Sequence, residues 1–240
     1  MSQSVRAGTR RIVISLTAAL MLCSILFVTN IAKANDDILT SDSTSTYTST
    51  AYKWTPSKQK NGITSYTRDV ARSKYKAVRG ETTLAVSTAR LFAAINDAPA
   101  CPEWADTCKE SYIQQAVSPH EFFIYTLNDL PWPVADRDVV AHVRWSKDAD
   151  GVVVMNSTAV NNQVAQEKGV VRIALATAKW RFKALAENST AASFEIHMDP
   201  NGNIPSWLLN RLILNSPFST FDNLAEQAAK EKYAGATLPF

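Results

Sequence analysis

The feature of the sequence that most constrains its fold is a long series of segments in which polar and apolar residues alternate. A period of two is typical of β-strands with one buried face. The alternation predicts strands over residues 63–70, 74–85, 112–117, 121–128, 138–147, 152–160, 168–185 and 191–198. The segment 168–185 is too long for a flat strand, so we expect it to bend or to contain a bulge.

Three further segments have helical periodicity. Residues 88–97 predict a short amphipathic helix, and a second short helix is expected around residues 101–111. A long helix is predicted from Pro205, which suits a first helical turn, to about Tyr233, with an interruption at Pro217. This order of elements favours an α+β fold in which a strongly curved antiparallel sheet wraps around a long C-terminal helix.

The first 34 residues have the layout of a secretory signal peptide. Arginines precede an apolar run at residues 12–28, and Ala32-Lys33-Ala34 provides small residues before a cleavage site at Asn35. A retained membrane anchor is the alternative, because the run approaches the roughly 18 apolar residues that indicate a spanning helix. We expect cleavage, and therefore an exported mature protein.

Removal of this segment changes the charge balance of the protein. The whole chain contains 25 Lys and Arg residues against 22 Asp and Glu, for a formal net charge of +3. The predicted signal peptide contains four of the basic residues and no acidic residue, which leaves 21 basic and 22 acidic residues and a net charge of about −1. The basic excess therefore belongs to the export signal, and we expect no nucleic-acid partner.

The mature chain is long enough for one domain with a sizeable core. Residues 35–51 include a run made almost entirely of Ser and Thr, and they are expected to form a flexible linker. One folded domain is predicted over residues 52–234, followed by a short tail at residues 235–240.

Cys101 and Cys108 are the two cysteines of the mature chain. An oxidising compartment favours a disulfide between them, which would staple a local loop. Metal binding is the alternative for a cysteine pair, but no histidine or third cysteine stands nearby with suitable spacing. We therefore predict a disulfide, no metal site and no cofactor.

The segment at residues 129–145, DLPWPVADRDVVAHVRW, joins a rigid turn to a strand with one apolar face. Proline torsions set the chain direction in the Pro131-Trp132-Pro133 turn. On one face of the following strand the alternation places four apolar side chains, Val139, Ala141, Val143 and Trp145. The pattern alone suits both an ordinary packed core and the lining of a space for a hydrophobic ligand.

Three motifs in the chain resemble those of the START domain family, the steroidogenic-acute-regulatory-related lipid-transfer family. They are Pro131-Trp132-Pro133 followed by RDVV at residues 137–140, EKGVVR at residues 167–172 with Trp180, and DPNGNIP at residues 199–205 with WLLN at 207–210, Pro217 and Thr220. The resemblance covers nearly the whole mature domain. The exported form with paired cysteines is similar to START-like proteins of Gram-negative bacteria, which implies a periplasmic location.

The resemblance implies a helix-grip fold with a hydrophobic tunnel between the sheet and the C-terminal helix, which acts as a lid. We therefore expect a monomer that binds a lipid or other hydrophobic small molecule, contacts membrane surfaces transiently and is not an enzyme. The predicted ligand-binding residues are Phe123, Tyr125, Val139, Ala141, Val143, Trp145, Trp180, Trp207, Leu208, Ile213 and Phe218.

The polar residues of these motifs refine that expectation. Arg137 and Asp138 are interpreted as a structural ion pair or turn lock. Sterol-binding members of the family carry an arginine inside the tunnel further along this strand, where this chain has Val143. The difference favours a ligand held mainly by apolar contacts, with one hydrogen bond from Tyr125 or Thr126.

Two other classes of function stay open. Cyclases and hydrolases share the helix-grip architecture, so an enzyme acting on a hydrophobic substrate is the alternative. Acid-base chemistry needs a titratable group aimed into the cavity, but His120 follows a proline in a turn, and His142 and His197 alternate with polar residues. A third hypothesis is that the apolar side of the last helix docks a protein partner.

Overall fold

The computed structural model describes residues 52–240, except residues 133, 162–163 and 203. The predicted signal peptide at residues 1–34 and the predicted linker at residues 35–51 lie outside the described residues. Among the helices of the described residues, none is both long enough and apolar enough to cross a membrane.

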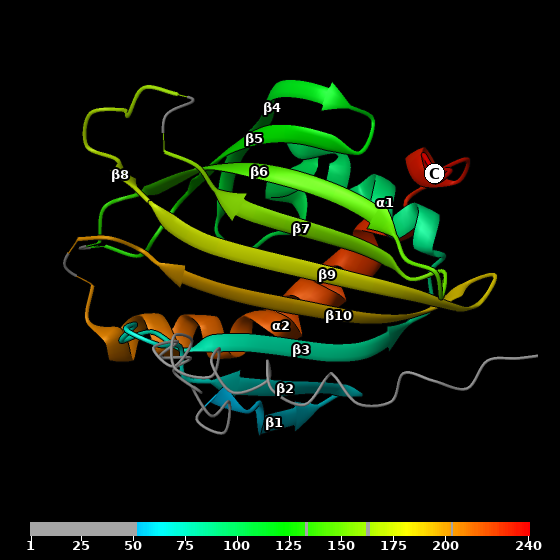
Figure 1. Ribbon diagram of the computed structural model, residues 1–240, viewed down its shortest axis with the longest axis horizontal. Coiled ribbons are helices and arrows are strands. Elements are labelled where there is room, and N and C mark those ends of the chain that lie inside the picture. Colours follow the sequence, from blue (N-terminus) through cyan, green and yellow to red (C-terminus); the bar gives the residue numbers. More distant parts are fainter. Residues whose placement is uncertain (1–51, 133, 162–163, 203) are drawn as a thin grey trace, which may run out of the picture. The chain divides into compact units, whose positions relative to one another are not determined.

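A ten-stranded sheet forms the framework of the described residues (Figure 1). Its strand order is β1-β2-β3-β10-β9-β7-β6-β5-β4 with antiparallel pairing, and β8 pairs in parallel with β6. The strands are β1 (Thr55–Lys60), β2 (Ile63–Arg68), β3 (Ala77–Leu84), β4 (Cys108–Ser118), β5 (Glu121–Asn128), β6 (Arg137–Lys147), β7 (Val153–Ala159), β8 (Val171–Arg172), β9 (Leu175–Ala186) and β10 (Ser189–Asp199).

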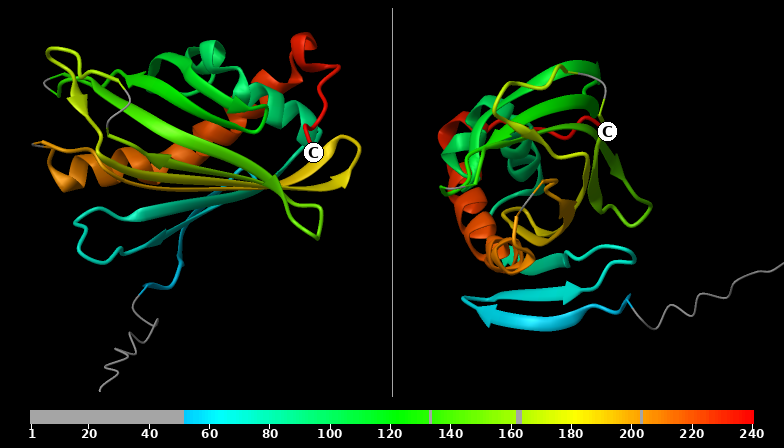
Figure 2. Two further views of the ribbon diagram at one scale, coloured as in Figure 1. Left: turned by 45° about the horizontal axis from the view of Figure 1, so that its top comes forward. Right: turned by 90° about the vertical axis from the view of Figure 1, so that its left-hand side faces the viewer.

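The helices lie on the concave side of this sheet. Figure 2 shows the sheet curving around α2, with α1 beside that helix. The helices are α1 (Thr88–Asn96), α2 (Ser206–Ala229) and the short 3₁₀-helices η2 (Ala98–Glu103) and η3 (Glu231–Tyr233). The predicted α+β helix-grip fold, a strongly curved antiparallel sheet around a long C-terminal helix, is confirmed.

β1 is a strand that the alternation does not predict. All six of its residues are exposed, so neither face imposes a hydrophobic period. β1 pairs with β2 through a turn at Asn61 and Gly62, whose φ angles are both positive, 52° and 76°. Asn-Gly is the dipeptide that tight hairpin turns of this kind favour, and it is the sequence signal that would have revealed the strand.

Two other predicted segments differ from the structure. The helix expected around residues 101–111 is the end of η2 followed by β4, and Pro102 within η2 lacks the N–H that a longer helix would need. The expected long strand at residues 168–185 is divided into β8 and β9, with a break at residues 173–174. The chain therefore pairs briefly with β6 as β8, and then continues as β9 between β7 and β10.

The helix α2 continues through Pro217 instead of being interrupted there. Proline removes one N–H from the helical ladder, and the carbonyl of Ile213 that this N–H would reach accepts a hydrogen bond from Ser216 Oγ at 2.9 Å. Pro217 is buried against Gly80 of β3, where an added Cβ would lie 2.6 Å from Pro217 Cβ. The absence of a side chain at Gly80 is therefore what lets helix and sheet approach so closely.

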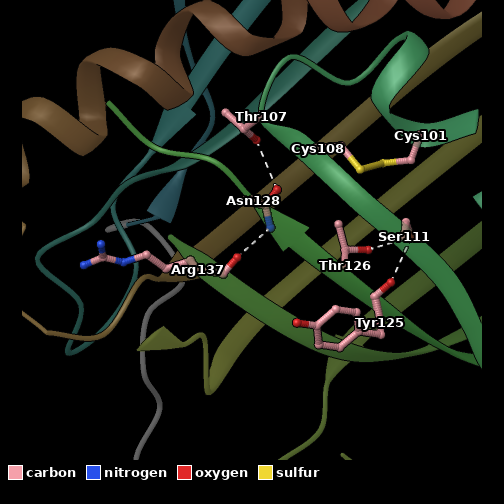
Figure 3. Close-up of a disulfide and its surroundings, with 8 residues drawn as sticks. All are labelled: Cys101, Thr107, Cys108, Ser111, Tyr125, Thr126, Asn128 and Arg137. Atoms are coloured by element: carbon pink, nitrogen blue, oxygen red, sulfur yellow. Dashed lines mark hydrogen bonds between the residues drawn. A yellow bond between two sulfur atoms is a disulfide. The ribbon is translucent and has the colours of Figure 1, made fainter. Parts of the chain in front are cut away.

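The predicted disulfide between Cys101 and Cys108 is present, with their Cα atoms 5.9 Å apart. It joins η2 to the beginning of β4 (Figure 3). Within the loop that it closes, Asp106 accepts hydrogen bonds from Ser219 Oγ and from Asn223 Nδ2 of α2, the second at 3.0 Å. The disulfide therefore restrains a loop that holds the middle of α2.

Removing this disulfide is expected to lower the free energy of unfolding. The double change Cys101→Ser and Cys108→Ser should cost about 2–3 kcal/mol, because closing a short loop restricts the unfolded chain. Guanidinium unfolding followed by tryptophan fluorescence measures the loss, and wild type treated with a reductant should show the same loss. Equal stability of the double variant and the oxidised wild type would contradict the prediction.

Candidate functional site

The apolar face of β6 points to the concave side of the sheet. Val143 and Trp145 are 4% and 2% exposed and belong to the main core cluster, while Ala141 is buried and Val139 is partly exposed. Phe122 of β5 is the cross-strand partner of Val143 and lies in the same cluster. The four residues thus share one face, as the alternation indicates, and they become more accessible toward the start of β6.

Aromatic side chains fill one half of the concave face. The ring of Trp180 lies 4.4 Å from that of Phe194 and 5.7 Å from that of Phe221 on α2, measured between centroids. Trp145 packs edge-on against Phe92 of α1 at 4.7 Å. Both tryptophans were predicted ligand contacts, and both are buried in this aromatic cluster.

The other half of the concave face has smaller side chains. Ser157 of β7, Ala178 of β9 and Ile196 of β10 are successive cross-strand neighbours, and all three are partly exposed. Ile196 also packs against the buried apolar cluster that includes residues of α2. Side-chain size therefore changes along the concave face, from the large aromatic residues to Ser157 and Ala178.

The loop between β5 and β6 closes over the N-terminal half of α2. Two loop residues pack against a buried apolar cluster that contains one residue just before α2 and two residues within it. We call these five the loop–helix cluster: Leu130, Val134, Ile204, Leu209 and Ile213. The contacts between the two segments are apolar side-chain contacts.

Two tryptophans beside this cluster are exposed to solvent. Trp132, between Leu130 and Val134 in the loop, is 92% exposed, and Trp207 in the first turn of α2 is 66% exposed. Trp207 therefore does not face the sheet, although it was a predicted ligand contact. Exposed tryptophans beside an apolar cluster are typical of a surface that meets an apolar partner.

The remaining predicted residues of α2 have three different environments. Ile213 is buried in the loop–helix cluster, whereas Leu208 is partly exposed. Phe218 packs at the edge of the main core, and the Nζ atom of Lys58 of β1 lies 5.1 Å from its ring centroid. Phe218 therefore faces the β1 side of the sheet.

Phe123 and Tyr125 lie on the opposite, outer face of the sheet, so the expectation that they share the face of Val143 is wrong. The register pairs Phe123 with His142 and Tyr125 with Val140. Odd-numbered residues of β5 therefore align with even-numbered residues of β6. Tyr125 is 2% exposed among outer-face apolar residues, and burial raises the pKa of its hydroxyl to about 12.

Of the two structural roles expected for Arg137 and Asp138, an ion pair or a turn lock, the ion pair between them does not form. Fully buried Asp138 accepts two hydrogen bonds from Arg172 of β8, from Nε at 2.7 Å and from Nη2 at 2.8 Å. Arg137 donates instead to the carbonyl oxygens of Ala135 and Asn201. Adjacent strand residues point to opposite faces, so an ion pair between Arg137 and Asp138 was sterically unfavourable from the start.

All three histidines lie away from the concave face. His142 contacts Glu121 Oε1 at 2.8 Å on the outer face, and His197 contacts Ser73 Oγ at 3.1 Å. His120 is in the turn between β4 and β5. The placement of His142 and His197 agrees with the polar side that the sequence assigned to them.

Comparison with known proteins identifies the family. A family model of the START domain matches residues 39–225. Uncharacterized protein PA1579 of Pseudomonas aeruginosa is 32% identical over 180 residues, which cover 75% of this chain and 89% of that protein. This chain therefore belongs to the START domain family.

Solved structures of other family members are similar. The STAR-related lipid transfer protein from Xanthomonas axonopodis superposes with a TM-score of 0.68 at 30% identity, covering 74% of this chain and 99% of that chain. Human STARD10 superposes with a TM-score of 0.67 at 15% identity, covering 75% of this chain and 74% of that chain, and shows the shared fold.

Proposed function

We propose that this protein binds one lipid or other hydrophobic small molecule between the concave face of the sheet and α2, and carries or senses it in the cell envelope. The START fold supports the binding of such ligands. The observation that carries the proposal is the change along the concave face from large buried aromatic side chains to the smaller side chains of Ser157 and Ala178. These side chains face the helix side of the sheet, where a ligand would be shielded from water.

The energetics of such a site suit a reversible carrier. Covering about 300 Å² of apolar ligand surface contributes roughly 7 kcal/mol at about 25 cal/mol per Å². The loss of ligand freedom on binding offsets part of this. Because about 7 kcal/mol corresponds to a dissociation constant of roughly 10 μM, the net affinity after this offset is weak enough to permit release.

Loading and release require the loop–helix cluster to open. Its residues join the β5–β6 loop to the N-terminal half of α2 through apolar contacts. The C-terminal half of α2 is held more firmly, because Asp106 and the carbonyl of Trp104 both accept hydrogen bonds from Asn223 Nδ2. We infer that the N-terminal half moves while the C-terminal half stays in place.

The cell envelope is the compartment that best suits these features. A disulfide between Cys101 and Cys108 is compatible with an exported protein. The sequence of residues 1–34 supports export independently. We therefore propose a periplasmic carrier or sensor, with PA1579 as a relative of the same family.

Ligand extraction tests this function directly. The protein is purified without detergent from cells that export it, and organic extracts are analysed by mass spectrometry beside those of an unrelated exported protein prepared in the same way. We expect about one hydrophobic molecule per protein that the control lacks. An empty protein that also fails to bind fluorescent fatty acids and phospholipids would overturn the proposal, and turnover of a bound hydrophobic ester would favour an enzyme.

Replacing the exposed tryptophans is expected to slow lipid exchange with membranes. Trp132→Ser and Trp207→Ser should each weaken binding to phospholipid vesicles about tenfold, because each removes an aromatic side chain that would enter the interface. Vesicle sedimentation and transfer of a fluorescent lipid measure the effect. Leu185→Ser is the control, because Leu185 is an exposed apolar residue near the C-terminal end of β9. This change should alter neither vesicle binding nor lipid transfer. Equal effects of all three changes would contradict a specific docking surface.

A further inference from the structure

A second, polar pocket lies on the outer face of the sheet. It has a volume of about 230 Å³ and is formed across β10, β9 and β7, with Trp54 and Arg68 at its border. Outward-pointing side chains of these strands line it, including Asn156, Thr158, Thr177, Lys179, Glu195 and His197. Ser157, Ala178 and Ile196 also border this pocket, so part of their exposed surface belongs to the outer face. The polar side chains of the pocket point away from the concave face, because successive strand residues alternate between faces.

Two cations at this pocket have no carboxylate partner among the described residues. Neither Arg68 nor Lys179 forms an ion pair with any acid in that part of the chain. The Arg68 guanidinium lies 4.8 Å from the centre of the Trp54 ring, and its buried Nε atom has no hydrogen-bond acceptor among the described residues. Because this Nε is buried, the other N–H groups of the guanidinium are the ones that can donate to a ligand in the pocket.

The acid that lines the pocket is engaged elsewhere. Glu195 Oε1 lies 4.0 Å from Nη1 of Arg79. Arg79 is shared, because its Nε atom also lies 3.2 Å from Glu81 Oε1 and its guanidinium stacks on Trp54. Glu195 and Glu81 thus both contact Arg79, and Asp199, which acts to raise the pKa of His197, does not line the pocket. The lining itself contains two cations, Arg68 and Lys179, and one acid, Glu195, and this balance favours an anion.

Neutral hydrogen-bonding groups complete the lining. The amide of Asn156 and the hydroxyls of Thr158 and Thr177 are exposed at its floor. Burial, followed by the positive charge of Arg68, lowers the pKa of His197 below its ordinary value, so this imidazole is neutral at neutral pH. Hydroxyl and amide donors beside two cations are the groups that hold phosphate or carboxylate oxygens in proteins.

We propose that this outer pocket binds a small molecule, or a group of a larger one, that carries a phosphate or carboxylate oxyanion. Arg68 and Lys179 neutralise its charge, and the side chains of β7 and β9 accept and donate hydrogen bonds around it. The Trp54 ring holds the Arg68 guanidinium flat against the edge of the pocket. The site is independent of the lipid site, because it uses the opposite face of the same strands.

Titration with defined anions tests the proposal. Inorganic phosphate and acetate are added separately to the full chain at constant ionic strength, with chloride as the reference, and the three histidines are followed by NMR. We expect saturable shifts of the His197 signals and a rise in its pKa with phosphate or acetate. Lys179→Gln and Arg68→Gln should each weaken this binding about tenfold or more. Lys183→Gln, an exposed outer-face lysine of the same strand outside the pocket, should leave it unchanged.

A vesicle-binding experiment distinguishes a free anion from a lipid headgroup as the ligand of the pocket. Sedimentation compares phosphatidylglycerol vesicles with phosphatidylcholine vesicles for the wild type and the same three variants. Loss of phosphatidylglycerol binding in Lys179→Gln and Arg68→Gln, without any response to free anions, would assign the site to a headgroup. The proposal fails if His197 responds to neither anion and vesicle binding is equal in the wild type and in Lys179→Gln. Lipid extraction by the concave face would be unaffected by that failure.

Discussion

Replacing Asp138 with alanine is expected to lower the free energy of unfolding by about 3–5 kcal/mol, one of the largest effects of any single substitution in this protein. The carboxylate is completely buried, and both of its oxygens accept hydrogen bonds from Arg172. Its removal would leave the guanidinium of Arg172 buried without a counter-charge. Urea unfolding measured by tryptophan fluorescence and circular dichroism gives the change directly.

A nearby carboxylate provides the matched control. Asp136 lies two residues earlier and pairs with Lys109 at 3.0 Å, but both side chains have substantial exposure. Asp136→Ala should therefore cost less than about 1 kcal/mol. Combining Asp138→Ala with Arg172→Leu should recover part of the loss, because the unpaired charge is then absent. If Asp138→Ala is no more harmful than Asp136→Ala, the buried pair does not stabilise the fold as described.

The Asp138–Arg172 pair matters to function because it fixes β8 beside the start of β6. Arg172 also donates to the carbonyl oxygen of Val164 at 3.1 Å, which ties the segment before β8 to the start of β6. β8 pairs with β6 at residues 137–138, directly after the β5–β6 loop that covers α2. A weakened pair should therefore loosen the anchored end of that loop and speed ligand exchange at temperatures where the protein stays folded.

Ala178→Phe is expected to reduce the affinity for a fluorescent fatty acid or phospholipid about tenfold or more. Ala178 lies between Ser157 and Ile196 on the concave face, where its side chain is the smallest of the three. A phenyl ring there would displace ligand contacts, and losing about 60 Å² of apolar contact alone costs about 1.5 kcal/mol. Fluorescence titration of the purified protein measures the affinity.

The same substitution elsewhere on the strand serves as the control. Ala184→Phe introduces an identical side chain at an exposed position of β9 and should leave the affinity unchanged. Circular dichroism and thermal unfolding of both variants report whether the fold is intact. Undiminished ligand binding by a folded Ala178→Phe protein would show that the ligand, if one binds, does not occupy this part of the concave face.

Local patterns in the sequence account for most of the elements. Strands with one buried face, such as β5 and β6, show the period of two that burial imposes. The exposed β1 shows none, because nothing buries either of its faces. The disulfide was predictable as well, since only two cysteines remain in the mature chain and seven positions separate them.

The site was less predictable, because it depends on how separate strands align. Alternation places Phe123 and Tyr125 on one face of β5, but only the register with β6 decides which face that is. The size of the side chains on neighbouring strands likewise decides where the concave face is filled. Trp180 is buried by Phe194 and Phe221, which come from a different strand and from α2.

By itself the sequence determined the class of fold, the family motifs and the pairing of Cys101 with Cys108, because each depends on periodicity or on residues close together in the chain. Only the tertiary structure decided that Asp138 binds Arg172, 34 residues away, and that Arg68 and Lys179 meet at one outer pocket. Partners so distant in sequence leave no local pattern. They are brought together by the strand order and register of the folded sheet.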